Sequence, residues 1–247
     1  MKHLKTIMSV LAVLAAVSCA KTPTAGNGQV VFEVSSDQQI ADMTRSNVSD
    51  FTASLPSKND FTITITGVTV DYSWTGKISE WDAATKLVVG DYKVEASYGS
   101  LEEEGFDKPY FAGEASFAVA KDESINVKIT VSLANSVVKM QYTDNFKNYY
   151  KDYSFKLSRI NTEIVTFTKD ETRAAFVDGW QITLSGSYTS ELGKESQFQA
   201  KQLPNLDPKT AYTFIFDVKN VGGATLTITF RDNYTETVEL GDYELND

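Results

Sequence analysis

AYTFIFDVKNVGGATLTITF, residues 211–230, alternates apolar and polar side chains on both sides of a glycine pair. In an extended strand successive side chains point to opposite faces, so the large apolar residues of the first half share one face. These residues are Tyr212, Phe214, Phe216 and Val218. Gly222-Gly223 is a turn signal, and the alternation resumes directly after it. The stretch therefore predicts a β-hairpin with one buried face.

The same period of two runs through most of the chain, in segments rich in Val, Ile, Thr, Tyr and Phe. Besides the hairpin, it predicts strands at residues 29–35, 60–66, 86–89, 90–98, 115–119, 124–133, 137–142, 153–158, 164–168, 181–188, 196–201 and 235–240. The turn signals between them have the spacing typical of a β-sandwich. One short helix is predicted at residues 145–152, where Phe146, Tyr149 and Tyr150 fall on a common side, and we interpret these aromatic residues as core.

The two halves of the chain contain segments with a similar order of sequence features. Residues 86–96 and 202–214 each run from an apolar approach through a turn into an alternating strand opened by an aromatic residue. A chain of 247 residues is long enough for two ordinary domains with hydrophobic cores. We therefore predict an all-β protein with one short helix, made of two tandem antiparallel β-sandwich domains at residues 29–134 and 135–247.

Residues 1–18 predict a lipoprotein signal peptide. Lys2 and Lys5 give a positive start, and the apolar stretch at residues 7–17 is too short to span a membrane. Ala16-Val17-Ser18-Cys19 has the small-residue pattern of a bacterial lipobox, although Ala16 stands where Leu is commoner. The pattern predicts cleavage before Cys19, lipidation of its thiol, and a flexible polar tether at residues 19–28. The alternative is an ordinary signal peptide that contains a cysteine near its end.

Rare residues and charge exclude several classes of function. The one histidine, His3, lies in the predicted signal, so the mature chain would have no imidazole for Ser-His-Asp or Cys-His catalysis or for histidine-based zinc sites. A single cysteine allows no internal disulfide. Without the signal, 21 basic residues face 33 acidic ones, a net charge of about −12 that repels phosphate backbones. We therefore predict no nucleic-acid partner.

Three groups of side chains are candidates for binding or catalysis. Glu102-Glu103-Glu104 with Asp107 could offer oxygen ligands to calcium, but adjacent carboxylates usually point in different directions, and we favour a solvated loop. Nothing in the sequence places two carboxylates opposite each other for glycoside hydrolysis. Trp74, Trp81 and Trp180 could stack on sugars, although aromatic packing is the favoured interpretation for Trp74. We predict no catalytic residue, metal ligand or cofactor.

Three motifs resemble those of a known family. "Gly-x-Tyr-x-Val-x-Ala-x-Tyr-Gly" occurs at residues 90–99, "Phe-Asp-x-Pro-Tyr-Phe-x-Gly" at residues 106–113, and "Leu-Ala-Asn" at residues 133–135. Together they resemble the Bacteroides-type lipoproteins grouped as domain of unknown function 4493, which are similar to the fimbrillins. The resemblance implies two transthyretin-like, or fimbrillin-like, β-sandwich domains, and subunits that assemble by donating a strand.

The resemblance also implies a site of proteolytic maturation. Fimbrillins are cut by an arginine-directed protease after an early strand, and the matching stretch makes Arg45 the candidate site. The alternative is a solvated arginine in an ordinary loop. The short acidic tail after residue 240 favours a tip, anchor or accessory component over a shaft subunit.

The function expected is that of a non-enzymatic, outer-membrane-anchored lipoprotein with a fimbrillin-like structural or adhesive role, at the cell surface or facing the periplasm. Its expected partners are the membrane, through Cys19, and fimbrial subunits or a host or glycan ligand. The alternative is a monomeric lipoprotein that binds a glycan or a protein partner.

Overall fold

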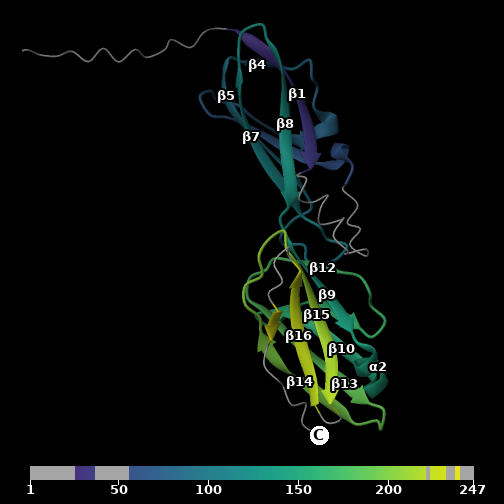
Figure 1. Cartoon of the computed structure of the whole chain (residues 1–247). Coiled ribbons are helices and arrows are strands. Elements are labelled where there is room, and N and C mark those ends of the chain that lie inside the picture. The colour runs from purple at the N-terminus through teal and green to yellow at the C-terminus, as the bar shows by residue number, and fades with distance from the viewer. Residues whose placement is uncertain (1–25, 37–55, 221–222, 232–236, 240–247) are drawn as a thin grey trace, which may run out of the picture.

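The computed structural model describes residues 26–36, 56–220, 223–231 and 237–239. In these residues the protein is all-β, with one short α-helix, as the sequence predicts. Figure 1 shows two lobes arranged end to end, the first purple to teal and the second teal-green to yellow. The N-terminal lobe contains strands β1–β5, β7 and β8, and the C-terminal lobe contains β9–β17 and helix α2.

The N-terminal lobe is one seven-stranded sheet with the order β3-β2-β5-β7-β8-β1-β4. Its strands are β1 (Asn27–Ser36), β2 (Thr62–Gly67), β3 (Ser73–Lys77), β4 (Lys86–Val88), β5 (Gly90–Tyr98), β7 (Phe111–Val119) and β8 (Ser124–Leu133). Strands β7 and β8 pair only at Phe111 with Leu133 and Ala112 with Ser132. Buried residues from both sides of this seam form one cluster, so the two halves of the sheet enclose a shared core.

The C-terminal lobe contains a four-stranded sheet, β11-β10-β13-β14, and a six-stranded sheet, β17-β16-β15-β9-β12-β6. The strands are β9 (Ser136–Tyr142), β10 (Tyr150–Arg159), β11 (Thr162–Thr168), β12 (Ala175–Val177), β13 (Ile182–Ser190), β14 (Glu195–Gln202), β15 (Ala211–Asn220), β16 (Gly223–Arg231) and β17 (Thr237–Glu239). The sixth strand, β6 (Gly105–Phe106), comes from the sequence of the N-terminal lobe and pairs with β12.

The two lobes repeat one strand order. The series β3-β2-β5-β7 corresponds to β11-β10-β13-β14, and the series β8-β1-β4 corresponds to β15-β9-β12. Each lobe has one parallel pair at the same place, β1 with β8 and β9 with β15, within otherwise antiparallel ladders. We propose on this ground that the domain boundary lies at residues 134–135. The segments 86–96 and 202–214, however, hold non-equivalent strands: β4 and β5 in one, the ends of β14 and β15 in the other.

The predicted hairpin at residues 211–230 forms as strands β15 and β16, with Tyr212 opposite Phe230 and Val218 opposite Ala224. The predicted inner face is buried, and Phe214 is fully so. Because β15 also pairs with β9 on its other side, the hairpin lies inside the six-stranded sheet rather than at its edge.

Helix α2 (Asp144–Tyr149) confirms the predicted helix but is shorter at its end. The Thr143 hydroxyl caps the helix by accepting a hydrogen bond from the Phe146 N–H at 3.2 Å. Tyr150 begins strand β10, opposite Ser190, so the prediction of helix at residues 150–152 is wrong. The buried rings of Phe146 and Tyr150 lie 4.8 Å apart, which confirms that these aromatic residues are core. Among the described residues, no helix has the length and apolar content needed to cross a bilayer.

Two strands, β6 and β12, were not predicted. Strand β12 has three residues, all buried, and β6 has two. Such short segments carry no readable alternation, and their pairing is decided by distant partners.

Candidate functional site at the junction of the lobes

The two residues predicted as modification sites, Cys19 and Arg45, lie outside the described residues. The structure gives their flanking elements: β1 begins at Asn27, two residues before its predicted start and eight residues beyond Cys19. In the sequence, Arg45 lies between β1 and the short 3₁₀ helix η1 (Lys58–Asp60).

The carboxylates of the acidic run, the candidate calcium ligands, do not converge on one point. Glu103 pairs with Lys108 at 3.1 Å, Glu104 pairs with Arg159, and Asp107 pairs with Arg173 at 2.7 Å. Within the part of the chain that the structure describes, no three His, Cys, Asp or Glu side chains come close enough to hold a metal ion. Three carboxylates of the run are therefore partners of basic side chains.

The three tryptophans have two different environments. Trp74 and Trp81 pack edge to face with ring centroids 5.0 Å apart, and the Trp81 Nε1–H donates to the Val30 carbonyl at 2.9 Å. These two are partly buried and pack against the core cluster of the N-terminal lobe, which confirms the aromatic packing predicted for Trp74. Trp180 is 49% exposed, so it remains accessible to a ligand.

The three sequence motifs meet at one place. Tyr98 of the first motif pairs with Phe111 of the second, and Phe111 pairs with Leu133 of the third. Gly99 has φ +77°, and a Cβ there would lie 2.3 Å from the Pro109 carbonyl oxygen. Only glycine combines that backbone conformation with so close an approach. The motifs therefore specify the packing of the junction rather than a reactive centre.

Asn135 connects the lobes at this junction. It is fully buried, and its side-chain oxygen accepts a hydrogen bond from the Tyr110 N–H. Its carbonyl accepts from the Lys209 N–H at 2.8 Å, and the neighbouring Ala134 N–H donates to the Tyr110 carbonyl at 2.7 Å. One residue thus satisfies backbone groups from both sides of the junction.

Residues 104–107, Glu-Gly-Phe-Asp, cross from the N-terminal lobe to the C-terminal lobe, and we name them the strap. In strand β6, Gly105 pairs with Phe176 and Phe106 pairs with Ala175. The Phe106 ring meets the Phe167 ring edge to face at 5.1 Å. The strap therefore contributes both a backbone ladder and an aromatic contact to the second lobe.

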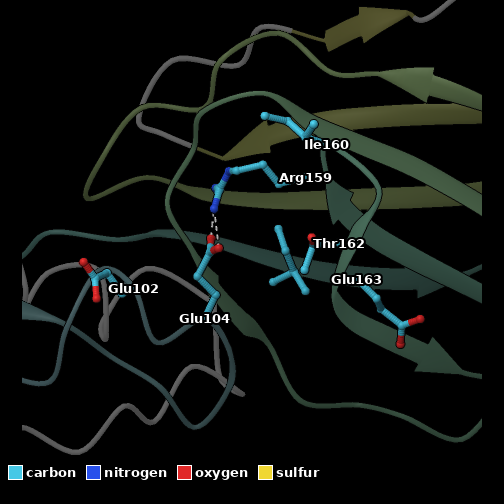
Figure 2. A pocket seen from close by; sticks show the side chains of 7 residues that line it. Glu102, Glu104, Arg159, Ile160, Thr162 and Glu163 are labelled. Carbon is cyan, nitrogen blue, oxygen red and sulfur yellow. Dashed lines mark hydrogen bonds and ion pairs between the residues drawn. The ribbon is translucent and has the colours of Figure 1, made fainter.

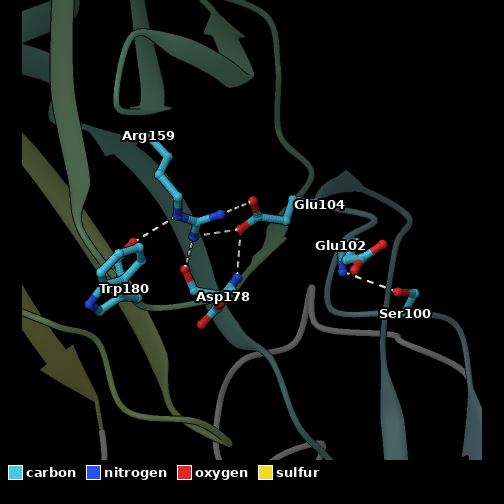
Figure 3. Close-up of polar contacts among 6 residues, drawn as sticks. All are labelled: Ser100, Glu102, Glu104, Arg159, Asp178 and Trp180. Atoms are coloured by element: carbon cyan, nitrogen blue, oxygen red, sulfur yellow. Dashed lines mark hydrogen bonds and ion pairs between the residues drawn. The ribbon is translucent and has the colours of Figure 1, made fainter.

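Glu104 and Arg159 form a bidentate ion pair across the junction, which Figure 3 shows. Their side chains are only 11% and 20% exposed. Glu104 also accepts the Asp178 N–H at 2.7 Å, while Arg159 donates to the carbonyls of Asp178 and Trp180. The charges are thus paired and hydrogen-bonded where water is largely excluded, the condition under which such a pair is strong.

A second, more exposed ion-pair group holds the other end of the strap. Arg173 donates to Asp107 at 2.7 Å and to Glu171 at 2.8 Å, and its guanidinium carbon lies 4.5 Å from the Phe106 ring centroid. The hydrogen bonds from Arg173 hold the pKa of Glu171 below its usual range. Because Arg173 and Asp107 are largely exposed, this group adds less stability than the Glu104–Arg159 pair.

A hollow of about 440 Å³ lies beside the Glu104–Arg159 pair (Figure 2). It is lined by Glu102, Glu104, Arg159, Ile160, Thr162, Glu163 and Ile164. Its volume is within the range of small-ligand pockets. Its one cation is already paired with Glu104, so the hollow offers carboxylates and isoleucine side chains to a visiting group.

Sequence reasoning missed Arg159 and Asp178. The two lie 55 and 74 residues from Glu104, and neither belongs to a motif. The only available signal was the position of Glu104, two residues before the start of the second motif. A pairing over such a separation depends on the topology, which the local pattern does not carry.

The fold and the junction define a two-lobed all-β protein whose three sequence motifs meet where its lobes join. The family model described as "Domain of unknown function (DUF4493)" matches residues 26–241. The chain belongs to this family. None of the curated proteins matches it.

Several solved structures are similar to the chain. One is the fimbrial anchor protein Mfa2 from Porphyromonas gingivalis, with 11% identity, a TM-score of 0.42, and coverage of 88% of this chain and 100% of that chain. Another is a "putative adhesin" from Bacteroides thetaiotaomicron, with 14% identity, a TM-score of 0.44, and coverage of 87% and 99%. A third, from the same organism and described among "putative polysaccharide binding proteins", has 10% identity, a TM-score of 0.44, and coverage of 88% and 100%.

Proposed function

We propose that this protein is a non-enzymatic lipoprotein anchored in the outer membrane through Cys19, with a structural or adhesive role as a tip, anchor or accessory component. The names of the similar structures, a fimbrial anchor and an adhesin, describe roles of this kind. The support for the proposal comes from observations of this chain. Fimbrial subunits or a host ligand are the partners proposed.

The observation that carries the proposal is the place where the tether would enter the fold. Strand β1 begins eight residues after Cys19 and lies between β8 and β4 inside its sheet. It pairs with β8 in parallel through eight residue pairs. A force from the membrane along β1 would shear this ladder parallel to the strands. All of its hydrogen bonds would then have to break at the same time. An attachment point built in this way supports anchorage of the folded part.

The same strand bears on the proposed cut at Arg45. Cleavage there would leave β1 held by its ladders and by its buried side chains Val30, Phe32 and Val34. Departure of β1 would uncover β8 and β4 and would also detach the protein from Cys19. A molecule that remains anchored must therefore keep β1, which supports an anchor or accessory role over that of a shaft subunit.

The second candidate function is that of a monomeric lipoprotein that binds a glycan or a protein partner. The half-exposed indole of Trp180 favours it, because an accessible aromatic ring can stack on a sugar face. A glycan array with the wild-type protein and the Trp180→Ala variant tests this candidate. Binding that Trp180→Ala abolishes would support it, and the absence of binding by the wild type would count against its glycan form.

Lipidation can be tested by labelling cells with a clickable palmitate analogue and fractionating their membranes. We expect label and outer-membrane location for the wild type, and neither for Cys19→Ser. Lys21→Ser, two residues away in the predicted tether, is the matched control and should behave like the wild type. An unlabelled wild type would contradict the proposal.

A further inference from the structure

We propose that the strap, residues 104–107, is a latch that fixes the angle between the two lobes. The proposal does not rest on the proposed function, since it concerns the mechanics of the fold alone. It begins from the repeated topology. In the N-terminal lobe β4 ends its sheet, whereas its counterpart β12 carries one more strand, β6. Strand β6 is therefore an addition to the repeated plan, supplied by the opposite lobe.

Every residue of the strap contacts the C-terminal lobe. Glu104 pairs with Arg159, and Gly105 and Phe106 form the ladder with β12. Asp107 pairs with Arg173. Four successive residues are thus held by side chains and backbone of the second lobe, which is more than chain connectivity requires.

The lobes also exchange phenylalanines at the latch. Phe106, from the sequence of the N-terminal lobe, packs against the core cluster of the C-terminal lobe. Phe176, from the C-terminal lobe, is buried in the core cluster of the N-terminal lobe. The two lie on paired strands, so the β6–β12 ladder positions both. Opening the latch would withdraw an aromatic ring from each core.

Domains joined by a short connection move relative to each other unless a substantial interface prevents it. Here the chain passes directly from β8 to β9 through Ala134 and Asn135. The Glu104–Arg159 pair opposes rotation about this connection, because separating it would leave two charges without partners in a place largely shielded from water. We infer that the lobes hinge at residues 134–135 once the latch is removed.

Double electron–electron resonance (DEER) tests the latch, because it measures the distribution of distances between two spin labels, one in each lobe. Spin labels would be placed at Ser73→Cys in β3 and Gln197→Cys in β14, both exposed, in a Cys19→Ser background. The parent should give one narrow distance distribution. Glu104→Ala/Asp107→Ala should widen it at least twofold. The matched control is Glu95→Ala/Glu114→Ala, which removes two carboxylates paired with Lys93 inside one lobe and should leave the width unchanged.

A folded strap variant with the parental width would overturn the proposal. Circular dichroism establishes that each variant is folded. If the double strap variant fails to fold, the milder Glu104→Gln decides the matter, because it removes the charge of the pair with Arg159 and keeps the shape of the side chain. A wider distribution in Glu104→Gln would then support the latch, and an unchanged one would overturn it.

Discussion

The side-chain oxygen of Asn135 accepts the backbone N–H of Tyr110, and through this bond the third sequence motif holds the second. Asn135 is fully buried, and Tyr110 lies directly before strand β7. The bond explains why an asparagine stands at the turn between the lobes: a side-chain acceptor is needed there for a backbone donor away from water.

Replacing Asn135 with alanine should lower the free energy of unfolding by about 1–3 kcal/mol, because the Tyr110 N–H would lose its acceptor. Urea denaturation followed by circular dichroism measures the loss. Asn126→Ala, at an exposed position in β8, is the control and should change stability little. Equal effects of the two substitutions would show that the junction bond has no special importance.

The Glu104–Arg159 pair should be energetically coupled. Either Glu104→Ala or Arg159→Ala alone should lower the free energy of unfolding by about 1.5–3 kcal/mol, since each leaves a partly buried charge without its partner. A double-mutant cycle should show the double variant to be less damaged than the sum of the single ones. Additive effects would mean that the two side chains do not stabilise each other.

Gly99 and Gly193 both have positive φ but differ in their surroundings. A Cβ at Gly99 would lie 2.3 Å from the Pro109 carbonyl oxygen, whereas at Gly193 it would meet only the Lys151 Nζ at 3.4 Å. Gly193→Ala should therefore cost about 1 kcal/mol from its backbone conformation alone. Gly99→Ala should cost clearly more, because the backbone itself must move. Thermal unfolding of both variants gives the comparison, and a smaller loss for Gly99→Ala would contradict it.

The protein should lose stability at alkaline pH through Tyr142. Its buried hydroxyl has no hydrogen-bond partner among the described atoms, and burial raises its pKa above the ordinary value of 10.0. The unfolded chain therefore ionises first. The stabilising contribution is complete below about pH 10 and falls as the pH rises further. Burial also raises the pKa of Tyr153, so several groups share the effect.

Tyr142→Phe should remove part of this dependence. The variant should be as stable as the wild type or more so at pH 7, because an unpaired buried hydroxyl is lost, and its midpoint of alkaline unfolding should move to higher pH. Fluorescence-monitored titration between pH 8 and about pH 12 measures the midpoint. A Tyr142→Phe variant that unfolds at the same or lower pH would show that Tyr142 is not the group responsible.

Much of the fold could be predicted from side-chain alternation alone. Strands β5 and β8 have the predicted bounds, and the 211–230 hairpin has its predicted buried face. Alternation could not reveal that β1 pairs with β8 in parallel, because the pairing partner of a strand is set by the global topology. The same holds for β6 and β12, which are too short to show a period.

The junction was only half visible in the sequence. Its motifs could be located, but the acidic run at residues 102–104 was interpreted as a solvated loop, because Arg159, the partner of Glu104, is 55 residues away in the sequence. Charged residues near a motif can thus stabilise the packing between two lobes. The prediction of lipidation at Cys19 and of cleavage at Arg45 comes from local processing patterns and stays a prediction.

The central proposal is that a lipidated Cys19 anchors the folded part to the membrane through the predicted tether that leads into β1. Its most direct test is mass spectrometry of the N-terminal peptide of the mature protein, purified from the membranes of a Bacteroides expression host. The account predicts a peptide that begins at Cys19 and carries acyl chains on its thiol. A mature chain that begins at another residue, or one that retains an unmodified Cys19, would contradict it.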